Sequence, residues 1–413
     1  MDFTLSDRSR ELRDRLAAFM DEYVYPAEAA YARSRATSLD PHHIPPIVED
    51  LKVEARSRGL WNLFLPGVSG LSNVEYAPLA ELMGRSPVLA AEACNCSAPD
   101  TGNMELLHMF ANPEQNERWL LPLLRGEIRS CFAMTEPDVA SSDATNIRTT
   151  IQCDGDDYVV KGRKWFVTGA QHPLCRLVIV LGVSNSGAAP HLRHSMILVP
   201  LETTGVEIVR NVPVFNHYAP EGHCEVLLNN VRVPRTNLLG EEGQGFALAQ
   251  ARLGPGRVHH CMRTIGQCEL ALDLMTLRAL ERRAFNQCLA DFSNVQDWIA
   301  ESRIEIDQAR LLVLQAASKL DRLGNKAARV DVSAIKVIAP RLQTRVCDRA
   351  IQIFGAMGVT TDTPLADLFL WGRALRFVDG PDEVHLRVVA QQEFKRVQRD
   401  GELRDYLRTL SAP

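Results

Sequence analysis

Residues 149–167 read TTIQCDGDDYVVKGRKWFV, and they are the first sign of a sheet in this chain. Two runs rich in β-branched and aromatic residues flank the turn residues DGDD, which is the pattern of paired strands. Further short runs of this kind follow before Val233: RLVIVLGV, SMILVPL, VEIVRNVPVF and CEVLLNNVRV. Several strands at this spacing predict a small central β-domain, a barrel or a sandwich, at residues 130–240.

Helical patterns lie on both sides of this β-domain. Ser6 is a plausible N-cap for the first helix, Pro26 is expected to end or kink it, and helical runs continue to about Leu124. After the turn GEEGQG at 240–245, long helices return. Mostly apolar residues that recur every three or four positions form one seam along a helix, which predicts that this helix packs in a bundle. They are Ile299, Ser302, Ile306, Ala309, Val313, Ala316, Leu320 and Leu323. The expected class is α+β, with an N-terminal helical domain at 1–129 and a C-terminal four-helix bundle at 241–413.

The composition is that of an ordinary globular protein, with 46% hydrophobic and 23% charged residues. A net charge of -5 is too mild to predict a nucleic acid or an anionic membrane as a partner. The ten cysteines contain no CxxC pair, so reduced thiols and no metal site are expected. The N-terminus lacks a secretory signal, and no apolar run is long enough for a bilayer. We therefore expect a cytoplasmic protein, or a processed protein of an organellar matrix.

A candidate catalytic carboxylate lies in RALRFVDGPDEVH, residues 373–385. Gly380 and Pro381 break the helical run, so Asp379 is expected on an elbow of the chain. Phe377 and Val378 would supply a dry wall beside the carboxylate, which suits a general base. The acids after this elbow, Asp382 and Glu383, fall in the first turn of a last helix, where negative charge is favourable.

Two blocks near the β-domain could contact a ring system. CFAMTEPDVASSDA, residues 131–144, presents hydroxyl groups on a loop after a helical segment. In KWFVTGA, residues 164–170, strand alternation predicts that Trp165 and Phe166 point to opposite faces and that Thr168 shares the face of Phe166. Such a plate with a nearby hydroxyl suits a flat heterocycle, although an ordinary pair of core residues has the same appearance.

Two further blocks lie in the C-terminal helices. LERRAFNQ, residues 280–287, is expected at a helix end, where an arginine could grip a pyrophosphate. AIQIFGAMG, residues 350–358, has glycines that permit close approach of a phosphate or a backbone. No GxGxxG or GxxxxGK motif supports a Rossmann or P-loop fold. His259 and His260 are adjacent on a helix and diverge by about 100°, so they are interpreted as packing or substrate-pocket residues, not as metal ligands.

The blocks TEP, KWFVTG, RRAF, QIFGAMG and DGPDEVH resemble, in this order and over essentially the whole chain, the acyl-CoA dehydrogenase family. The runs LGPGRVHHCMR, WIAESR and DGPDEVH are most similar to the branch that animals carry fused to a kinase-like domain, some members of which handle 4-hydroxyacyl-CoAs. The resemblance implies a flavoprotein of fatty acid β-oxidation that converts an acyl-CoA to a trans-2-enoyl-CoA with bound FAD. It also implies electron-transfer flavoprotein as the electron acceptor, and a homodimer or homotetramer.

The resemblance implies a role for each matching residue. Asp379 would be the catalytic base, one methylene shorter than the glutamate of most members. Thr135 would bond the flavin ring, Phe166 would lie against it, Thr168 would contact its N5 region, and Ser142 would reach the pyrophosphate. Further cofactor contacts are expected from Phe132, Met134, Ser141 and Phe285, and from Arg282, Gln352 and Gly355 toward the FAD of a neighbouring subunit. The expected substrate-binding residues are Ser142, Arg257 and Gly380.

Two alternatives stay open. Nitroalkane oxidases also resemble this family and use an aspartate base, so a flavin oxidase of the nitroalkane or acyl-CoA oxidase kind could pass electrons to oxygen. A non-catalytic scaffold that kept the fold is the second alternative.

Overall fold

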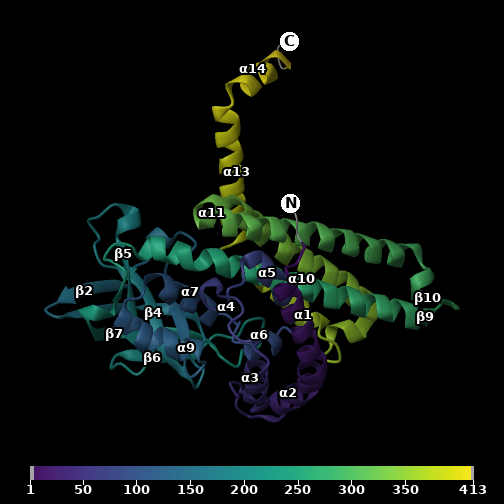
Figure 1. Cartoon of the computed structure of the whole chain (residues 1–413), viewed down its shortest axis with the longest axis horizontal. Helices are drawn as coiled ribbons and strands as arrows, with labels where there is room; N and C mark the ends of the chain where they lie inside the picture. Colours follow the sequence, from purple (N-terminus) through teal and green to yellow (C-terminus); the bar gives the residue numbers. More distant parts are fainter. Residues whose placement is uncertain (1–3, 411–413) are drawn as a thin grey trace. The chain divides into compact units, whose positions relative to one another are not determined.

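The computed structural model describes residues 4–410 (Figure 1). The chain divides into two compact units, Leu5–Gly256 and a second unit that begins at Arg257. Among the described residues, no helix is long and apolar enough to cross a membrane. All ten cysteines are free thiols.

The first unit begins with helices, as predicted. They are α1 (Asp7–Phe19), α2 (Tyr25–Thr37), α3 (Ile47–Ser57), α4 (Pro66–Ser69), α5 (Asn73–Gly84), α6 (Ala90–Ala93), α7 (Asp100–Phe110), α8 (Pro113–Gln115) and α9 (Leu121–Leu124). Ser6 is the N-cap of α1, and its Oγ accepts a hydrogen bond from the backbone N of Ser9 at 3.1 Å. A π-helical segment, Met20–Val24, joins α1 to α2, and a second, Asn116–Leu120, joins α8 to α9. The helical run does not end at Pro26, which lies in the first turn of α2.

The second half of this unit is a mixed eight-stranded sheet. Its strands are β1 (Arg129–Ala133), β2 (Thr150–Asp154), β3 (Asp157–Thr168), β4 (Cys175–Val183), β5 (His194–Pro200), β6 (Val206–Asn211), β7 (His223–Pro234) and β8 (Leu238–Leu239). They run in the order β6-β7-β3-β2-β4-β5-β8, and β1 pairs parallel with β4. Buried apolar side chains of β1, β3, β4, β5 and β7 form its core. The sheet confirms the central β-region, but sequence patterning missed the two short strands β1 and β8.

The orientation predicted for Trp165 and Phe166 from strand alternation is wrong. Phe166 has a positive φ of 51°, and the pairing of β3 with β7 shifts register between Lys164 and Val167. This bulge interrupts the pleat, so the rings of Trp165 and Phe166 contact each other with centroids 4.8 Å apart instead of pointing to opposite faces. Phe166 is 42% exposed.

The second unit is a helical bundle. Its elements are α10 (Gly245–Glu281, which starts in the first unit), β9 (Arg283–Ala284), β10 (Gln287–Cys288), α11 (Ser293–Phe354), α12 (Leu365–Leu375), α13 (Asp382–Arg399) and α14 (Gly401–Leu410). Within this unit α10 and α11 lie side by side (Figure 1), and Arg303 makes a two-pronged ion pair with Glu269 at 2.6 and 2.9 Å. Only the first turn of α13 is buried, through Asp382 and His385.

The long helix α11 breaks at Gly324, which has φ 76° and ψ 174°. The predicted seam is buried from Ser302 to Leu320, and Ile299 is half-buried. At Leu323 the seam prediction is wrong, because this side chain stands beside the break and is 62% exposed. The prediction that residues 280–287 lie at a helix end is confirmed, since α10 ends at Glu281, but a β-hairpin comes next, with Phe285 and Asn286 at positive φ in its turn.

We expect Gly324→Ala to destabilise the protein by about 1–3 kcal/mol, since this backbone region is open almost only to glycine. A Cβ at Gly324 would meet no atom within 4 Å, so the loss measures backbone strain alone. Gly256→Ala is the matched control, because Gly256 lies inside α10 and its added Cβ also meets nothing. Helix propensity predicts that the control stabilises slightly. A thermal unfolding midpoint that Gly324→Ala leaves unchanged would contradict the strain at this break.

Candidate active site

Asp379 lies on the predicted elbow, between α12 and α13. Its φ is 57° and that of Gly380 is 110°, both in the left-handed half of backbone space. The Arg257 Nε donates a hydrogen bond to the Asp379 carbonyl oxygen at 2.9 Å, and the His385 Nε2 lies 3.3 Å from the same oxygen. A Cβ at position 380 would come within 3.0 Å of the His385 Nε2, so glycine is required there. The elbow thus has a fixed backbone.

The two histidines that face Asp379 differ in role. Burial first, and then Arg257 and Lys336, lower the pKa of His385 to about 4, so its ring is neutral. Since a carbonyl oxygen only accepts, the proton of His385 is on Nε2, and its Nδ1 accepts from the Ser333 hydroxyl at 3.3 Å. The His260 Nε2 lies 3.5 Å from the Asp379 Oδ2. His385 therefore contacts the main chain of Asp379 and His260 its carboxylate.

One expectation about the surroundings of Asp379 is wrong. Phe377 is 58% exposed and lies under the Arg373 guanidinium, 4.4 Å from the ring centroid, so it does not provide a dry wall. Asp382 is in the first turn of α13, as predicted, but it is buried between Arg341 and Arg376, with N–O distances of 2.9 and 2.8 Å. The arginines hold the start of α13 against α11, because a buried carboxylate needs such partners.

In the first unit, a buried ion pair holds the loop that carries Thr135. The Lys164 Nζ donates to the Met134 carbonyl at 2.9 Å, to Glu136 Oε1 at 2.9 Å and to the Leu181 carbonyl at 2.7 Å. Burial lowers the pKa of Lys164 to about 8, although the nearby Glu136 carboxylate acts to raise it. For Glu136, Lys164 and nearby donors outweigh burial and lower its pKa. Both groups are therefore charged at neutral pH.

Other predicted cofactor residues of the first unit have contacts of their own. The Trp165 backbone N donates to the Thr135 carbonyl at 3.0 Å, which ties the loop to the bulge at Phe166. The Thr168 Oγ1 lies 2.9 Å from the His223 Nδ1. The Ser141 Oγ accepts from the Glu136 backbone N at 2.9 Å and so closes the loop, while Ser142 is exposed. Met134 is half-buried, and the half-buried Phe132 ring lies 4.1 Å from the Arg252 guanidinium carbon.

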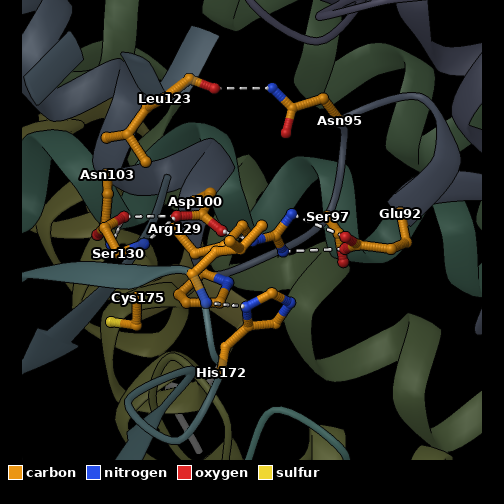
Figure 2. A network of polar contacts seen from close by, with 12 residues as sticks. Glu92, Asn95, Ser97, Asp100, Asn103, Leu123, Arg129, Ser130, His172 and Cys175 are labelled. Atoms are coloured by element: carbon orange, nitrogen blue, oxygen red, sulfur yellow. Dashed lines mark hydrogen bonds and ion pairs between the residues drawn. The ribbon is translucent and has the colours of Figure 1, made fainter. Parts of the chain in front are cut away.

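A second buried charge network fixes the strand that leads into this loop (Figure 2). Arg129, the first residue of β1, pairs with Glu92 at 2.8 and 2.9 Å and with Asp100 at 2.7 Å. Burial opposes the charge of Glu92, but Arg129 and Lys52 outweigh it and lower its pKa to about 2. Asp100 also accepts from the backbone N of Ser130 at 2.7 Å. These partners are far apart in sequence, and no sequence signal pointed to them.

The remaining predicted cofactor residues lie at another part of the second unit. The Arg278 guanidinium lies 5.4 Å from the Phe354 ring centroid, so the C-terminal ends of α10 and α11 are adjacent. Arg282, Gln352 and Gly355 are exposed there, and Phe285 is 92% exposed on the hairpin turn. Arg283, in contrast, is used within the hairpin, where its Nη2 donates to the Asn286 carbonyl at 2.9 Å.

Family models match this chain along nearly its full length. The N-terminal, middle and C-terminal domains of acyl-CoA dehydrogenase match residues 6–127, 131–231 and 243–394. The chain belongs to the acyl-CoA dehydrogenase family. This confirms the predicted family, its fold with a β-region between two helical ones, and the enzyme class, an oxidoreductase.

Individual relatives support the assignment. The chain is 58% identical to the probable acyl-CoA dehydrogenase FadE2 of Mycobacterium tuberculosis, over 96% of this chain and 98% of the relative. It is 49% identical to acyl-CoA dehydrogenase family member 11 of Gallus gallus, over 95% of this chain but only 51% of the relative. The chain thus spans about half the length of this animal relative, and the predicted likeness to the animal branch is confirmed.

Solved structures agree with the fold. A structure described as an acyl-CoA dehydrogenase from Mycobacterium abscessus superposes with a TM-score of 0.92 at 48% identity, covering 95% of this chain and 99% of that one. Butyryl-CoA dehydrogenase from Megasphaera elsdenii superposes with a TM-score of 0.81 at 24% identity, over 95% of this chain and all of that one, which supports the fold alone.

Lys164→Met should destabilise the acyl-CoA dehydrogenase by about 3–5 kcal/mol, because it leaves Glu136 buried without its partner. The unfolding midpoint in denaturant measures the loss. Lys161→Met is the matched control, since Lys161 is exposed on the same strand and its loss should change stability little. Equal midpoints for the two variants would show that the ion pair does not hold the loop.

Proposed function

We propose that this acyl-CoA dehydrogenase uses Asp379 as its general base and passes electrons to an electron-transfer flavoprotein. The observation that supports the base is the elbow itself, in which Arg257 and His385 hold the carbonyl of a residue at positive φ. Such a backbone is strained for a non-glycine residue, and strain of this kind gathers at functional sites. We assign to Asp379 the removal of the α-proton of an acyl-CoA, which leaves a trans-2-enoyl-CoA once the β-hydrogen has left as hydride.

The α-proton of a thioester is weakly acidic, so the base needs help from donors at the carbonyl oxygen of the substrate. We propose that the main-chain N–H of Asp379 is one donor, since the elbow presents the carboxylate and the backbone of the same residue together. Arg257 and Gly380, proposed as substrate-binding residues, then act by shaping this backbone. Arg257 fixes the carbonyl of Asp379, and Gly380 gives the chain its turn.

FAD is the cofactor of the family, and residues of the first unit fit its isoalloxazine. The exposed face of the Phe166 ring is a flat apolar surface beside the loop of Thr135. The Trp165 Nε1 next to it is buried and has no acceptor among the described residues, so it can donate to a bound ring. When bound, FAD accepts the β-hydride of the substrate. We propose Phe132, Met134, Thr135, Ser141, Ser142, Phe166 and Thr168 as its contacts in this unit.

The remaining proposed FAD contacts, Arg282, Phe285, Gln352 and Gly355, require a second copy of the chain. Arg257 lies on α10 and Arg282 directly follows its last residue, Glu281, so a helix rise of 1.5 Å per residue places them about 37 Å apart. This is well beyond the span of one FAD molecule. An FAD beside the Asp379 of one copy therefore cannot be held by the Arg282 of that copy. We propose a homodimer or homotetramer in which each copy grips a neighbour's FAD, with domains at 1–129, 130–240 and 241–413.

Asp379→Asn should keep bound flavin but lose its reduction by acyl-CoA by at least about 100-fold, because the amide cannot take the α-proton. Stopped-flow bleaching of the flavin under anaerobic conditions measures the rate, and a panel of short, medium and long acyl-CoAs identifies the substrate. Glu383→Gln is the control, since Glu383 is an exposed acid in the first turn of α13. Full bleaching in Asp379→Asn would remove this residue from the mechanism. A wild-type protein that takes up no FAD would favour the scaffold alternative.

One enzymatic alternative is a flavin oxidase of the same fold, because nitroalkane oxidases also use an aspartate base. If the proposal is right, reduced enzyme should be reoxidised quickly by an electron-transfer flavoprotein and slowly by dissolved oxygen. Assaying hydrogen peroxide with substrate and oxygen alone, and then with the flavoprotein added, separates the two. Stoichiometric peroxide at an undiminished turnover rate without the flavoprotein would establish the oxidase instead.

A further inference from the structure

Three polar residues lie along one face of α10 toward the elbow. Arg257, His260 and Arg263 are spaced three residues apart, which places them on neighbouring turns of the same side of the helix. Arg257 donates to the Asp379 carbonyl, and the His260 Nε2 faces the Asp379 Oδ2 at 3.5 Å. The Arg263 Nη2 lies 3.2 Å from the His260 Nδ1. The face thus offers one contact to the main chain of Asp379 and a separate one to its carboxylate.

The contact with Arg263 determines the tautomer of His260. A guanidinium carries only donors, so the Nδ1 of His260 must be the acceptor and carry no proton. The proton of the neutral ring is then on Nε2, the atom that faces the carboxylate. A protonated ring would direct an N–H at Arg263, which the guanidinium cannot accept. His260 is therefore set up as a neutral donor to Asp379.

We propose that His260 is a positioning residue that holds the Asp379 carboxylate in its working orientation, with Arg263 fixing the tautomer; this rests on Asp379 being the base. The Nε2–H of His260 restrains Oδ2, and the α-proton of the substrate goes to Oδ1. Both side chains are largely shielded, with 12% and 17% exposed, so the contact is little weakened by water.

A short carboxylate needs this restraint. The Arg257 Nε and the His385 Nε2 contact the carbonyl oxygen of Asp379, whereas rotation about its two side-chain bonds sets where the carboxylate oxygens lie. Aspartate is one methylene shorter than glutamate, so a wrong rotamer moves its oxygens away from the substrate carbon with no spare length to recover. A displacement of about 1 Å at a reacting group can lower a rate about 100-fold. Restraining one oxygen removes that freedom before the substrate arrives.

The test compares two amides at position 260. His260→Gln places an N–H near the position of the imidazole Nε2, whereas His260→Asn places it near Nδ1, too far back to reach Asp379. We expect His260→Gln to reduce its flavin at a rate close to wild type, and His260→Asn to be slower by about 10–100-fold. The dissociation constant for acyl-CoA should change little in either, because the contact with the base matters in the reaction step and not in substrate binding. Stopped-flow bleaching at increasing acyl-CoA concentration gives both quantities.

Flavin content and the unfolding temperature of each variant show that it is folded. His259→Gln is the matched control, because this neighbouring histidine is buried on another side of α10, where burial lowers its pKa to about 3. It should react at the wild-type rate. Equal rates for His260→Gln and His260→Asn, whether fast or slow, would overturn the positioning role.

The Asp379→Asn variant separates the two proposals. If its flavin bleaches normally, the proposed base itself is wrong. If its flavin does not bleach while the flavin of His260→Asn bleaches at the wild-type rate, only the role of His260 fails.

Discussion

The conformation of Asp379 depends on one carbonyl oxygen that receives two donors. Left-handed backbone for a residue with a Cβ costs about 1–3 kcal/mol, and that cost must be offset locally. The guanidinium of Arg257 and the neutral ring of His385 do so from two different helices, α10 and α13. Gly380 then lets the chain turn next to His385 where a Cβ would collide. These contacts thus fix the main chain of Asp379, from which its side chain leaves.

Buried charge has a comparable role in the first unit. Lys164 donates to two backbone carbonyls, Met134 and Leu181, as well as to Glu136, so it joins a loop to two strands. Arg129 does the same for the start of β1, through carboxylates on α6 and α7. An apolar core would pack these segments without fixing their register so closely. Breaking either network leaves a charge without partners, which makes both networks sensitive to single substitutions.

Periodicity, together with the positions of glycine and proline, was enough to predict the local features of the fold. The helix seam from Ser302 to Leu320, the strands around DGDD and the elbow at Asp379 all obey such local rules. The bulge at Phe166 does not, because nothing local forces a bulky residue to a positive φ; the pairing with β7 does. The hairpin at 283–288 was missed for a similar reason, since its turn uses Phe285 and Asn286 instead of the usual Asn-Gly.

The polar partners of the site were the least predictable part. Nothing in the local sequence marks Lys164 and Asp382 as buried, because their burial depends on partners far away in the chain. His260 shows what could have been found: its spacing from Arg257 and Arg263 is visible in RVHHCMR, but its significance depends on where the elbow lies. The resemblance to a family points to the motif positions, whereas the partners outside the motifs depend on how the chain folds.

The helix α10 links the surroundings of Asp379 to the proposed contact with a neighbouring copy of the chain. Its segment from Arg257 to Arg263 contacts Asp379, and the exposed Arg282 follows its last residue, beside the end of α11. Because a helix is stiff over this length, the roles proposed for Asp379 and Arg282 would have to be served by two copies of the chain. The proposed cofactor site would then be complete only after association. The exposed Phe285 at the hairpin turn fits the same argument, since a ring left 92% exposed in one copy is an apolar surface that a neighbouring copy can cover.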